Sequence, residues 1–317
     1  MTKQYRIAVA GSTAHTRICA EALFNHPSFT ISTILTPAPK PIGREQRVTE
    51  NPLHQFGLEH NIPTVLVKEK LDEVIVGRLE PLPQPDYLLV VDFGYFAPNW
   101  LLWWPSIAPI NIHPSLLPRW RGSSPGQFTL LYGEKRSAVS IIIMNNTLDA
   151  GEILAQMPII VNPAWTASDY YDHAFTGITT YLPKVLLDFA NVEITSMPQP
   201  VDSPTPIAGR FTRDDGYIPY TVLQAALAGK EVAGETGLPP VLQAAYEHHK
   251  ILSTTLECAS RAFHPWPGLW TRINTNAGEK RMKLLALSEK DGKILLETVQ
   301  VEGKQPVAWK QIEKTLQ

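Results

Sequence analysis

The chain has 317 residues, of which 44% are hydrophobic and 18% charged, and its formal net charge is −2. This length exceeds one typical domain, and the composition is that of a globular protein with enough apolar residues for two cores. The balanced charge excludes a uniformly basic protein, and no run approaches the 18 apolar residues of a membrane span.

The two cysteines, Cys19 and Cys258, lie far apart in the sequence and lack metal-type spacing. We therefore expect neither a metal site nor a disulfide framework. The residues before the first apolar run do not resemble a signal peptide, which has a longer apolar core. A reducing, cytoplasmic location fits both observations.

The first half of the chain alternates short apolar runs with helical patterns. Tyr5–Ala10, Ala14–Asn25 and Phe29–Leu35 read as strand, helix and strand, which is a βαβ unit and implies a parallel sheet. The turn Gly11–Thr13 contains one glycine, too few for a dinucleotide-binding fingerprint. Later strands are predicted at Ile62–Val67, Tyr87–Val91, Ala138–Met144 and Ile153–Val161, together with an apolar run that ends at Ile110. Helices are predicted at Leu53–His60, Leu71–Leu79, Pro98–Trp104, Ser124–Leu131 and Thr166–Ala190.

The second half begins after a Pro-rich segment, Met197–Pro206, which we predict to be a semi-rigid linker. Beyond it, helical patterns cover Leu223–Ala233 and Pro239–His249. Short alternating runs then favour a small β-barrel, at Leu269–Ile273, Met282–Leu287, Lys293–Val299 and Val307–Lys310. The predicted fold class is α/β: an open, mostly parallel Rossmann-like sheet with a smaller, OB-like C-terminal β-barrel. The predicted domains are 1–196 and 207–317, with 197–206 as the linker.

A long loop is predicted at Thr36–Pro52, and it carries Lys40, Arg44 and Arg47. Loops of this length in compact domains are usually functional or disordered. Charge alone favours a solvated surface loop. The last stretch, 261–317, carries ten Lys and Arg against six Asp and Glu, a net charge of +4. Such a bias is compatible with a phosphate-bearing partner.

The most informative stretch runs from Asn111 to Gly122 and follows the apolar run that ends at Ile110. In an extended strand, Asn111 and His113 point to the same face, about 6–7 Å apart. His113 can accept or donate a proton near neutral pH, and the Asn111 amide can donate a hydrogen bond to an oxyanion. Asp149, in a loop after another strand, could orient the imidazole. We call Asn111, His113 and Asp149 the trio.

The trio suits acyl transfer to an amine, because Ser115 is not in a nucleophile-elbow motif and no covalent enzyme intermediate is needed. Each residue also has an ordinary interpretation. A single His or Asn at a strand end is commonly a turn residue, and Asp149 could form a turn. The residues alone thus predict an α/β enzyme with His113 as a candidate general base.

A resemblance to a known family narrows the predicted activity further. Asn111-Ile-His113-Pro-Ser-Leu-Leu-Pro118-Arg-Trp-Arg-Gly122, followed by Leu148-Asp149-Ala-Gly151, resembles the signature of the folate-dependent formyltransferases. The resemblance implies that Asn111, His113 and Asp149 are catalytic. It also implies that four residues shape the folate site: Ser115, Leu116, Leu117 and Pro118.

Other segments are similar to the members of this family that formylate initiator methionyl-tRNA. They are Pro39–Arg44, Phe211–Gly216, Arg261–Gly268 and Val299–Lys304. The resemblance implies 10-formyltetrahydrofolate as donor, initiator methionyl-tRNA as acceptor, and Lys40, Arg44 and Arg47 as tRNA contacts. We further expect a monomer without a metal. Two rivals stay open: a sugar-nucleotide N-formyltransferase with the same donor, and a non-catalytic tRNA-binding protein. A 10-formyltetrahydrofolate hydrolase is disfavoured because no added regulatory domain is evident.

Overall fold

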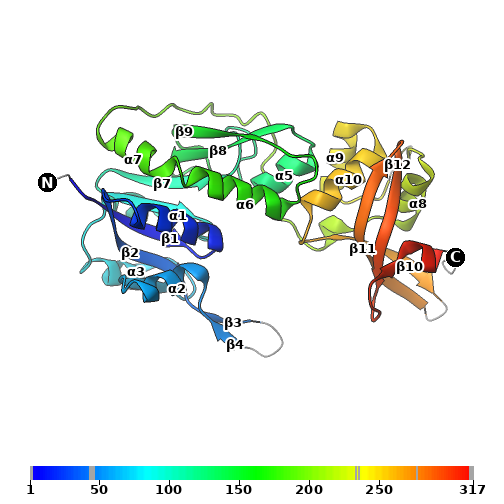
Figure 1. The fold of residues 1–317 in the computed structure, drawn as a ribbon, viewed down its shortest axis with the longest axis horizontal. Helices are drawn as coiled ribbons and strands as arrows, with labels where there is room; N and C mark the ends of the chain where they lie inside the picture. The colour runs from blue at the N-terminus through cyan, green and yellow to red at the C-terminus, as the bar shows by residue number, and fades with distance from the viewer. Residues whose placement is uncertain (1–2, 43–46, 233, 235, 276–277, 314–317) are drawn as a thin grey trace. The chain divides into compact units, whose positions relative to one another are not determined.

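The computed structural model describes residues 3–42, 47–232, 234, 236–275 and 278–313. The chain forms two compact units (Figure 1). The first unit comprises Met1–Gly122, Ala138–Ile159 and Asp172–Ile207, and the second comprises Ser123–Ser137, Ile160–Tyr171 and Ala208–Gln317.

The first unit is built on a seven-stranded sheet in the order β5-β2-β1-β6-β7-β8-β9. The pairs from β5 to β7 are parallel, whereas β8 runs antiparallel to β7. The strands are β1 (Tyr5–Gly11), β2 (Phe29–Pro37), β5 (Thr64–Val67), β6 (Tyr87–Val91), β7 (Ala108–His113), β8 (Arg136–Ile143) and β9 (Ile153–Ile160).

Helices cover both faces of this sheet. Residues alternate between the faces of a strand, so Ala8 and Ala10 point one way, into the apolar cluster that includes Ile75 and Leu101. Ile7 and Val9 point the other way, towards the face on which Figure 1 shows α1. The helices up to this point in the chain are α1 (Ala14–Phe24), α2 (Pro52–Glu59), α3 (Glu73–Leu79), α4 (Asn99–Leu102), α5 (Pro125–Leu131), α6 (Ala167–Ile178) and α7 (Leu182–Ala190). Of these, α5 and the first residues of α6 belong to the second unit. No helix in the described part of the chain is both long and apolar enough to span a membrane.

The strand order reverses beside β1. The chain proceeds from β1 outward to β2 and β5, then crosses to β6 on the opposite side of β1. In open α/β sheets, ligands bind at the carboxyl ends of the strands that flank such a reversal. The carboxyl ends of β1, β6 and β7 are therefore the edge at which a site is expected.

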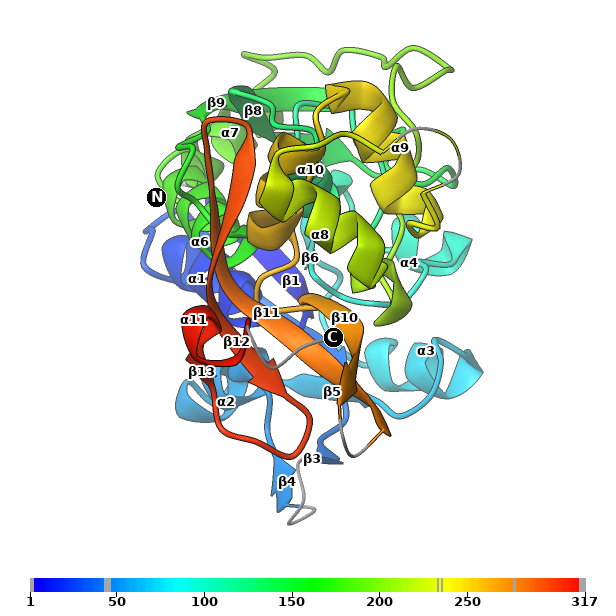
Figure 2. The same ribbon diagram turned by 90° about the vertical axis from the view of Figure 1, so that its right-hand side faces the viewer.

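The second unit contains an antiparallel four-stranded sheet in the order β10-β11-β12-β13. Its strands are β10 (Leu269–Thr275), β11 (Gly278–Lys290), β12 (Lys293–Val301) and β13 (Val307–Ala308). Figure 2 shows α8 and α10 beside this sheet: α8 contacts β10 and β12, and α10 contacts β11 and β12. The remaining helices are η1 (Asp214–Gly216), α8 (Tyr220–Ala228), α9 (Pro240–His249), α10 (Leu252–Ala262) and α11 (Trp309–Ile312). The predicted fold class is confirmed: a mostly parallel sheet with helices, and a smaller, separate β unit.

Three local predictions are wrong. The single helix predicted at Thr166–Ala190 is two helices, α6 and α7, because Pro183 lies in the first turn of α7, where its missing N–H is tolerated. The helix predicted to end at Ala233 ends at Ala228, where Gly229 adopts a left-handed conformation with φ of 68°. The predicted loop Thr36–Pro52 contains a hairpin of β3 (Lys40–Ile42) and β4 (Arg47–Thr49).

Candidate active site

Strand β7 carries Asn111 and His113 at its carboxyl end. Ala108, Ile110 and Ile112 are buried on one face of the strand, so Asn111 and His113 belong to the other. Asn111 pairs in register with Val90 of β6, and His113 pairs with Ser140 of β8. The two side chains therefore lie at the sheet edge where the strand order predicts a ligand.

His113 is almost completely buried, with 5% of its side chain exposed. Its Nε2 lies 3.0 Å from the backbone oxygen of Trp120. A carbonyl oxygen only accepts, so Nε2 carries the proton and Nδ1 has the lone pair in the neutral ring. Nδ1 lies 3.7 Å from Oδ2 of Asp149. The protein thus fixes the ring and its tautomer and leaves Nδ1 facing a carboxylate.

Asp149 is held by the loop between β8 and β9. Its φ of 49° is left-handed, a conformation that Asp tolerates better than most residues. The backbone N–H of Gly122 donates to Asp149 Oδ2 at 2.8 Å. Gly151 follows two residues later, and a Cβ there would lie 1.8 Å from the backbone oxygen of Ile143. Only glycine allows the loop to approach β8 this closely, so the Leu-Asp-x-Gly pattern has a direct structural basis.

A partly buried polar network supports the loop that carries Asp149. Nε2 of Gln199 donates to the backbone oxygens of Asp149 at 2.9 Å and Gly151 at 2.7 Å. Oε1 of Gln199 accepts from Nε and Nη2 of Arg121. Arg121, only 5% exposed, also donates to the backbone oxygens of Pro200 and Val201. The Pro-rich segment is therefore bonded to the loop that carries Asp149.

The segment Ser115–Pro118 is anchored mainly by its backbone. The Ser115 hydroxyl donates to the backbone oxygen of Arg119 at 2.8 Å, and the Ser115 carbonyl accepts from Ser140 Oγ at 2.7 Å. Leu117 is buried in a small cluster, whereas 36% of Leu116 is exposed. Of the side chains in this segment, Leu116 offers apolar surface to a ligand.

The trio provides three different chemical groups at one strand end. Within the part of the chain that the structure describes, the Asn111 side chain makes no hydrogen bond, so its amide is open to a ligand. His113 Nδ1 can exchange a proton, and the Asp149 carboxylate beside it stabilises a cationic ring. Among the described residues, no three His, Cys, Asp or Glu side chains form a group suited to a metal ion.

A second titratable cluster lies at the end of β6, beside the reversal of strand order. His15 Nδ1 lies 3.3 Å from Asp92 Oδ2, and His15 Nε2 lies 3.1 Å from Asp172 Oδ1. Burial alone lowers the pKa of His15, but the hydrogen bonds to Asp92 and Asp172 outweigh it, and the pKa is raised above its ordinary value. The ring also stacks on Phe175, with centroids 4.5 Å apart. This cluster joins the first turn of α1, the end of β6 and α6.

The comparison with protein families assigns this chain to a family. The family model described as "Formyl transferase" matches residues 5–186, which is more than half of the chain and includes the whole trio. The chain belongs to the formyl transferase family.

Curated relatives of this formyl transferase cover different shares of the chain. The methionyl-tRNA formyltransferase of Chloroflexus aurantiacus is 29% identical over 238 residues, which are 75% of this chain and 67% of that protein. The methionyl-tRNA formyltransferase of Gluconacetobacter diazotrophicus is 34% identical over 197 residues, 60% of this chain and 61% of that one.

Solved structures show the same fold as this formyl transferase at low identity. The methionyl-tRNA formyltransferase from Clostridium thermocellum superposes with a TM-score of 0.55 at 15% identity, covering 94% of this chain and 98% of that one. An N-formyltransferase from Helicobacter canadensis was solved with folinic acid and dTDP-3-aminofucose. It superposes with a TM-score of 0.55 at 15% identity, covering 97% of this chain and 99% of that one. At such identities the likeness concerns the fold alone.

The residues predicted to contact tRNA are only partly described. Lys40 is exposed at the start of β3. Arg47 begins β4, where only its backbone is described, and Arg44 lies outside the described residues. Their role stays a prediction, as do the roles of the trio and of Ser115–Pro118.

The sequence did not indicate the residues that position the trio. Arg121 and Gly122 belong to the motif but carried no assigned role, and nothing marked Gln199 within the Pro-rich segment. Gln199 and Arg121 are 78 positions apart, so no local pattern links them. The presence of Arg121 within the motif was the one available signal, and its burial, which requires partners, is visible only in the structure.

Proposed function

We propose that this chain transfers a formyl group from 10-formyltetrahydrofolate to the α-amine of initiator methionyl-tRNA. The observation that carries the proposal is the trio itself: an open Asn111 amide beside a buried His113–Asp149 pair, within the region that matches the formyl transferase family. The acceptor is suggested by the relatives named methionyl-tRNA formyltransferase.

In this proposal the methionyl amine attacks the formyl carbon, and the new C–N bond forms as the carbonyl oxygen gains negative charge. The Asn111 amide donates to that oxygen. His113 accepts the amine proton at Nδ1, where Asp149 stabilises the cationic ring. His113 then returns the proton to N10 of the folate as the bond from the formyl carbon to N10 breaks. The products are formylmethionyl-tRNA and tetrahydrofolate.

The donor fits the residues next to the trio. Leu116, which is 36% exposed and follows His113 by three residues, offers apolar surface of the kind that a flat folate ring system requires. Ser115, Leu117 and Pro118 support it by fixing the backbone of the segment. We further propose a cytoplasmic monomer in which Lys40, Arg44, Arg47 and the C-terminal unit, residues 207–317, contact the tRNA through its phosphates.

The main rival is a sugar-nucleotide N-formyltransferase. It is favoured by the fold likeness to the Helicobacter canadensis structure with a dTDP-amino sugar. The decisive test offers 10-formyltetrahydrofolate with methionyl initiator tRNA and, in parallel, with an amino-sugar nucleotide. We expect formylated methionyl-tRNA. Transfer to the sugar alone would reassign the acceptor, and equal, negligible turnover by wild type and His113→Ala would favour a non-catalytic tRNA-binding protein.

A further inference from the structure

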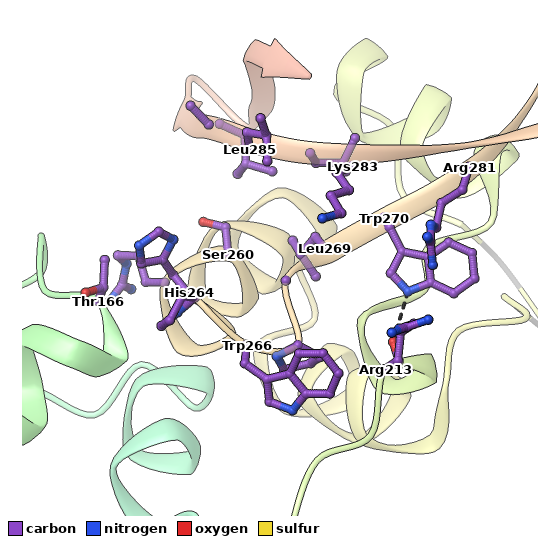
Figure 3. A pocket seen from close by; sticks show the side chains of 17 residues that line it. Thr166, Arg213, Ser260, His264, Trp266, Leu269, Trp270, Arg281, Lys283 and Leu285 are labelled. Carbon is purple, nitrogen blue, oxygen red and sulfur yellow. Dashed lines mark hydrogen bonds between the residues drawn. The ribbon is translucent and has the colours of Figure 1, made fainter. Parts of the chain in front are cut away.

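The second unit contains a pocket of about 620 Å³ that the proposed mechanism does not use (Figure 3). Strand β11 forms one wall, and the segment between α10 and β10 forms another. The motif Arg261–Gly268, which spans the end of α10 and this segment, is one of the sequence motifs for which no role has been assigned. We call this cavity the basic pocket and define it by Arg213, His264, Trp266, Trp270, Arg281 and Lys283.

The basic pocket is strongly one-sided in charge. None of its lining residues is Asp or Glu, whereas four are Arg or Lys. Arg261 Nε lies 2.6 Å from Glu257 Oε1, so this arginine is already paired within the second unit. Arg281 and Lys283 lie two apart on β11, so they point to the same face, and neither makes an ion pair with any described side chain. An anion is the ligand that would complete these groups.

Aromatic rings complete the lining. The Trp270 indole is fixed, because its Nε1 donates to the backbone oxygen of Arg213 at 2.9 Å and the Arg281 guanidinium stands 5.8 Å from the ring centroid. Trp266 is held through its backbone oxygen, which accepts from Gln127 Nε2 at 3.2 Å, but 50% of the residue is exposed. A half-exposed indole on an anchored segment is a surface on which a planar ring can stack.

The cationic surface continues beyond this pocket. Arg281 and Lys283 also line a smaller cavity of about 180 Å³ with Gln300 and Gly303 from the end of β12. Glu302 is the single acidic residue there. Two adjoining cavities that share the same two cations fit a chain of successive phosphates better than one isolated anion.

We infer that the basic pocket binds one unpaired nucleotide of an RNA strand. The base stacks on Trp266, while Arg281 and Lys283 contact the flanking phosphates (Figure 3). The inference rests on the proposed function only for the identity of this RNA, which is then the methionyl-tRNA acceptor. A free nucleotide offers the same base and phosphate, and the experiment separates the two.

The test measures binding of two labelled RNAs, unacylated initiator tRNA and a single-stranded hexanucleotide, by fluorescence anisotropy over a series of salt concentrations. Trp266→Ala should weaken binding of both by about tenfold, as expected for one lost base–aromatic stack. The double variant Arg281→Gln/Lys283→Gln should make the negative slope of log affinity against log salt shallower by about 1.4, which corresponds to two single-strand phosphates. A nucleoside monophosphate should compete only weakly.

Matched controls are available on the same protein. Lys290→Gln/Lys293→Gln removes two exposed cations from β11 and β12 outside the pocket, and Trp103→Ala removes a tryptophan that is 74% exposed in the first unit. Both should bind RNA as wild type does. Circular dichroism of Trp266→Phe, which keeps a ring for stacking, checks that the loop folds.

Unchanged RNA affinity in both Trp266→Ala and the double variant would overturn the inference, as would a wild type that binds neither RNA. A wild type that binds the nucleotide as tightly as the hexanucleotide would overturn the assignment to an RNA strand. Formyl transfer is assayed separately, so failure of the proposed function appears as lost turnover with RNA binding intact.

Discussion

The polar groups around His113 in the first unit are bonded to one another, whereas Arg281 and Lys283 in the second unit make no ion pair with any side chain that the structure describes. His113 and Asp149 are held by the backbone of Trp120 and Gly122, and Gln199 supports the loop behind them. The Arg281 guanidinium stands over the Trp270 ring, and Glu302 is the one acidic residue that lines the adjoining cavity. Catalysis requires groups fixed in advance, while phosphate binding tolerates side chains that adjust. The contrast supports the proposal that the first unit carries the chemistry and the second unit holds the RNA.

The largest effect should come from His113. His113→Ala removes the proton acceptor and should lower kcat for formyl transfer by about two to four orders of magnitude. Binding of tRNA should stay within about twofold of wild type, because the basic pocket is intact. Single-turnover formyl transfer and anisotropy measure the two quantities. A variant that keeps more than a tenth of the wild-type rate would show that His113 is not the proton acceptor.

Asp149→Asn tests whether charge or position matters in the first unit. The amide oxygen can still accept from the Gly122 N–H, but it cannot stabilise a cationic imidazole. We expect kcat to fall about a hundredfold while the free energy of unfolding changes by less than about 1 kcal/mol. Urea denaturation and kinetics on one preparation check both. A rate close to wild type would reduce Asp149 to a structural residue.

Gly151→Ala should destabilise the same loop through a steric clash. The added Cβ would meet the Ile143 carbonyl at 1.8 Å, and relieving that overlap should cost about 2–3 kcal/mol of stability. Gly77→Ala is the matched control, since nothing lies within 4 Å of its added Cβ and it sits inside α3. That substitution should stabilise slightly. Similar stabilities for both variants would contradict the close approach seen here.

The smallest effect should come from His15, and it depends on pH. The pKa of His15 is raised in the folded protein, so its protonation stabilises the fold. This contribution is complete below the unfolded pKa of about 6.5 and is lost as pH rises through the folded value. His15→Gln should therefore cost about 1 kcal/mol near pH 5.5 and much less near pH 9. Urea unfolding at both pH values measures the loss of unfolding free energy, and Asp172→Asn should give a smaller loss of the same sign. A loss that grows with pH would contradict a stabilising role for protonated His15.

The features predicted correctly from the sequence depend on short-range periodicity or on a motif. The apolar run Tyr87–Val91 is a strand buried at every position, and Asn111 and His113 share a face because residues alternate along a strand. The motif brought Asp149 to His113 although 36 positions separate them. The Thr166–Ala190 pattern was predicted as one helix because apolar spacing alone does not reveal that Pro183 starts a second one. Helix α10 was not predicted, and its N-cap residue, Ile251, is not one of the polar residues that mark a helix start.

Long-range contacts between polar residues could not be predicted. His15 meets Asp92 and Asp172 from 77 and 157 positions away, and each residue taken alone reads as an ordinary surface side chain. The basic pocket likewise combines Arg213 with residues of β10 and β11. The excess of Lys and Arg in 261–317 indicated a basic surface, but only the fold gathers these cations around tryptophans.

The most direct test of this division is steady-state kinetics with methionyl initiator tRNA as the varied substrate and 10-formyltetrahydrofolate saturating. We predict that His113→Ala lowers kcat with KM within about twofold, and that Trp266→Ala raises KM about tenfold with kcat unchanged. The opposite pattern, or a loss of kcat in Trp266→Ala equal to that in His113→Ala, would contradict the assignment of chemistry and RNA binding to separate units.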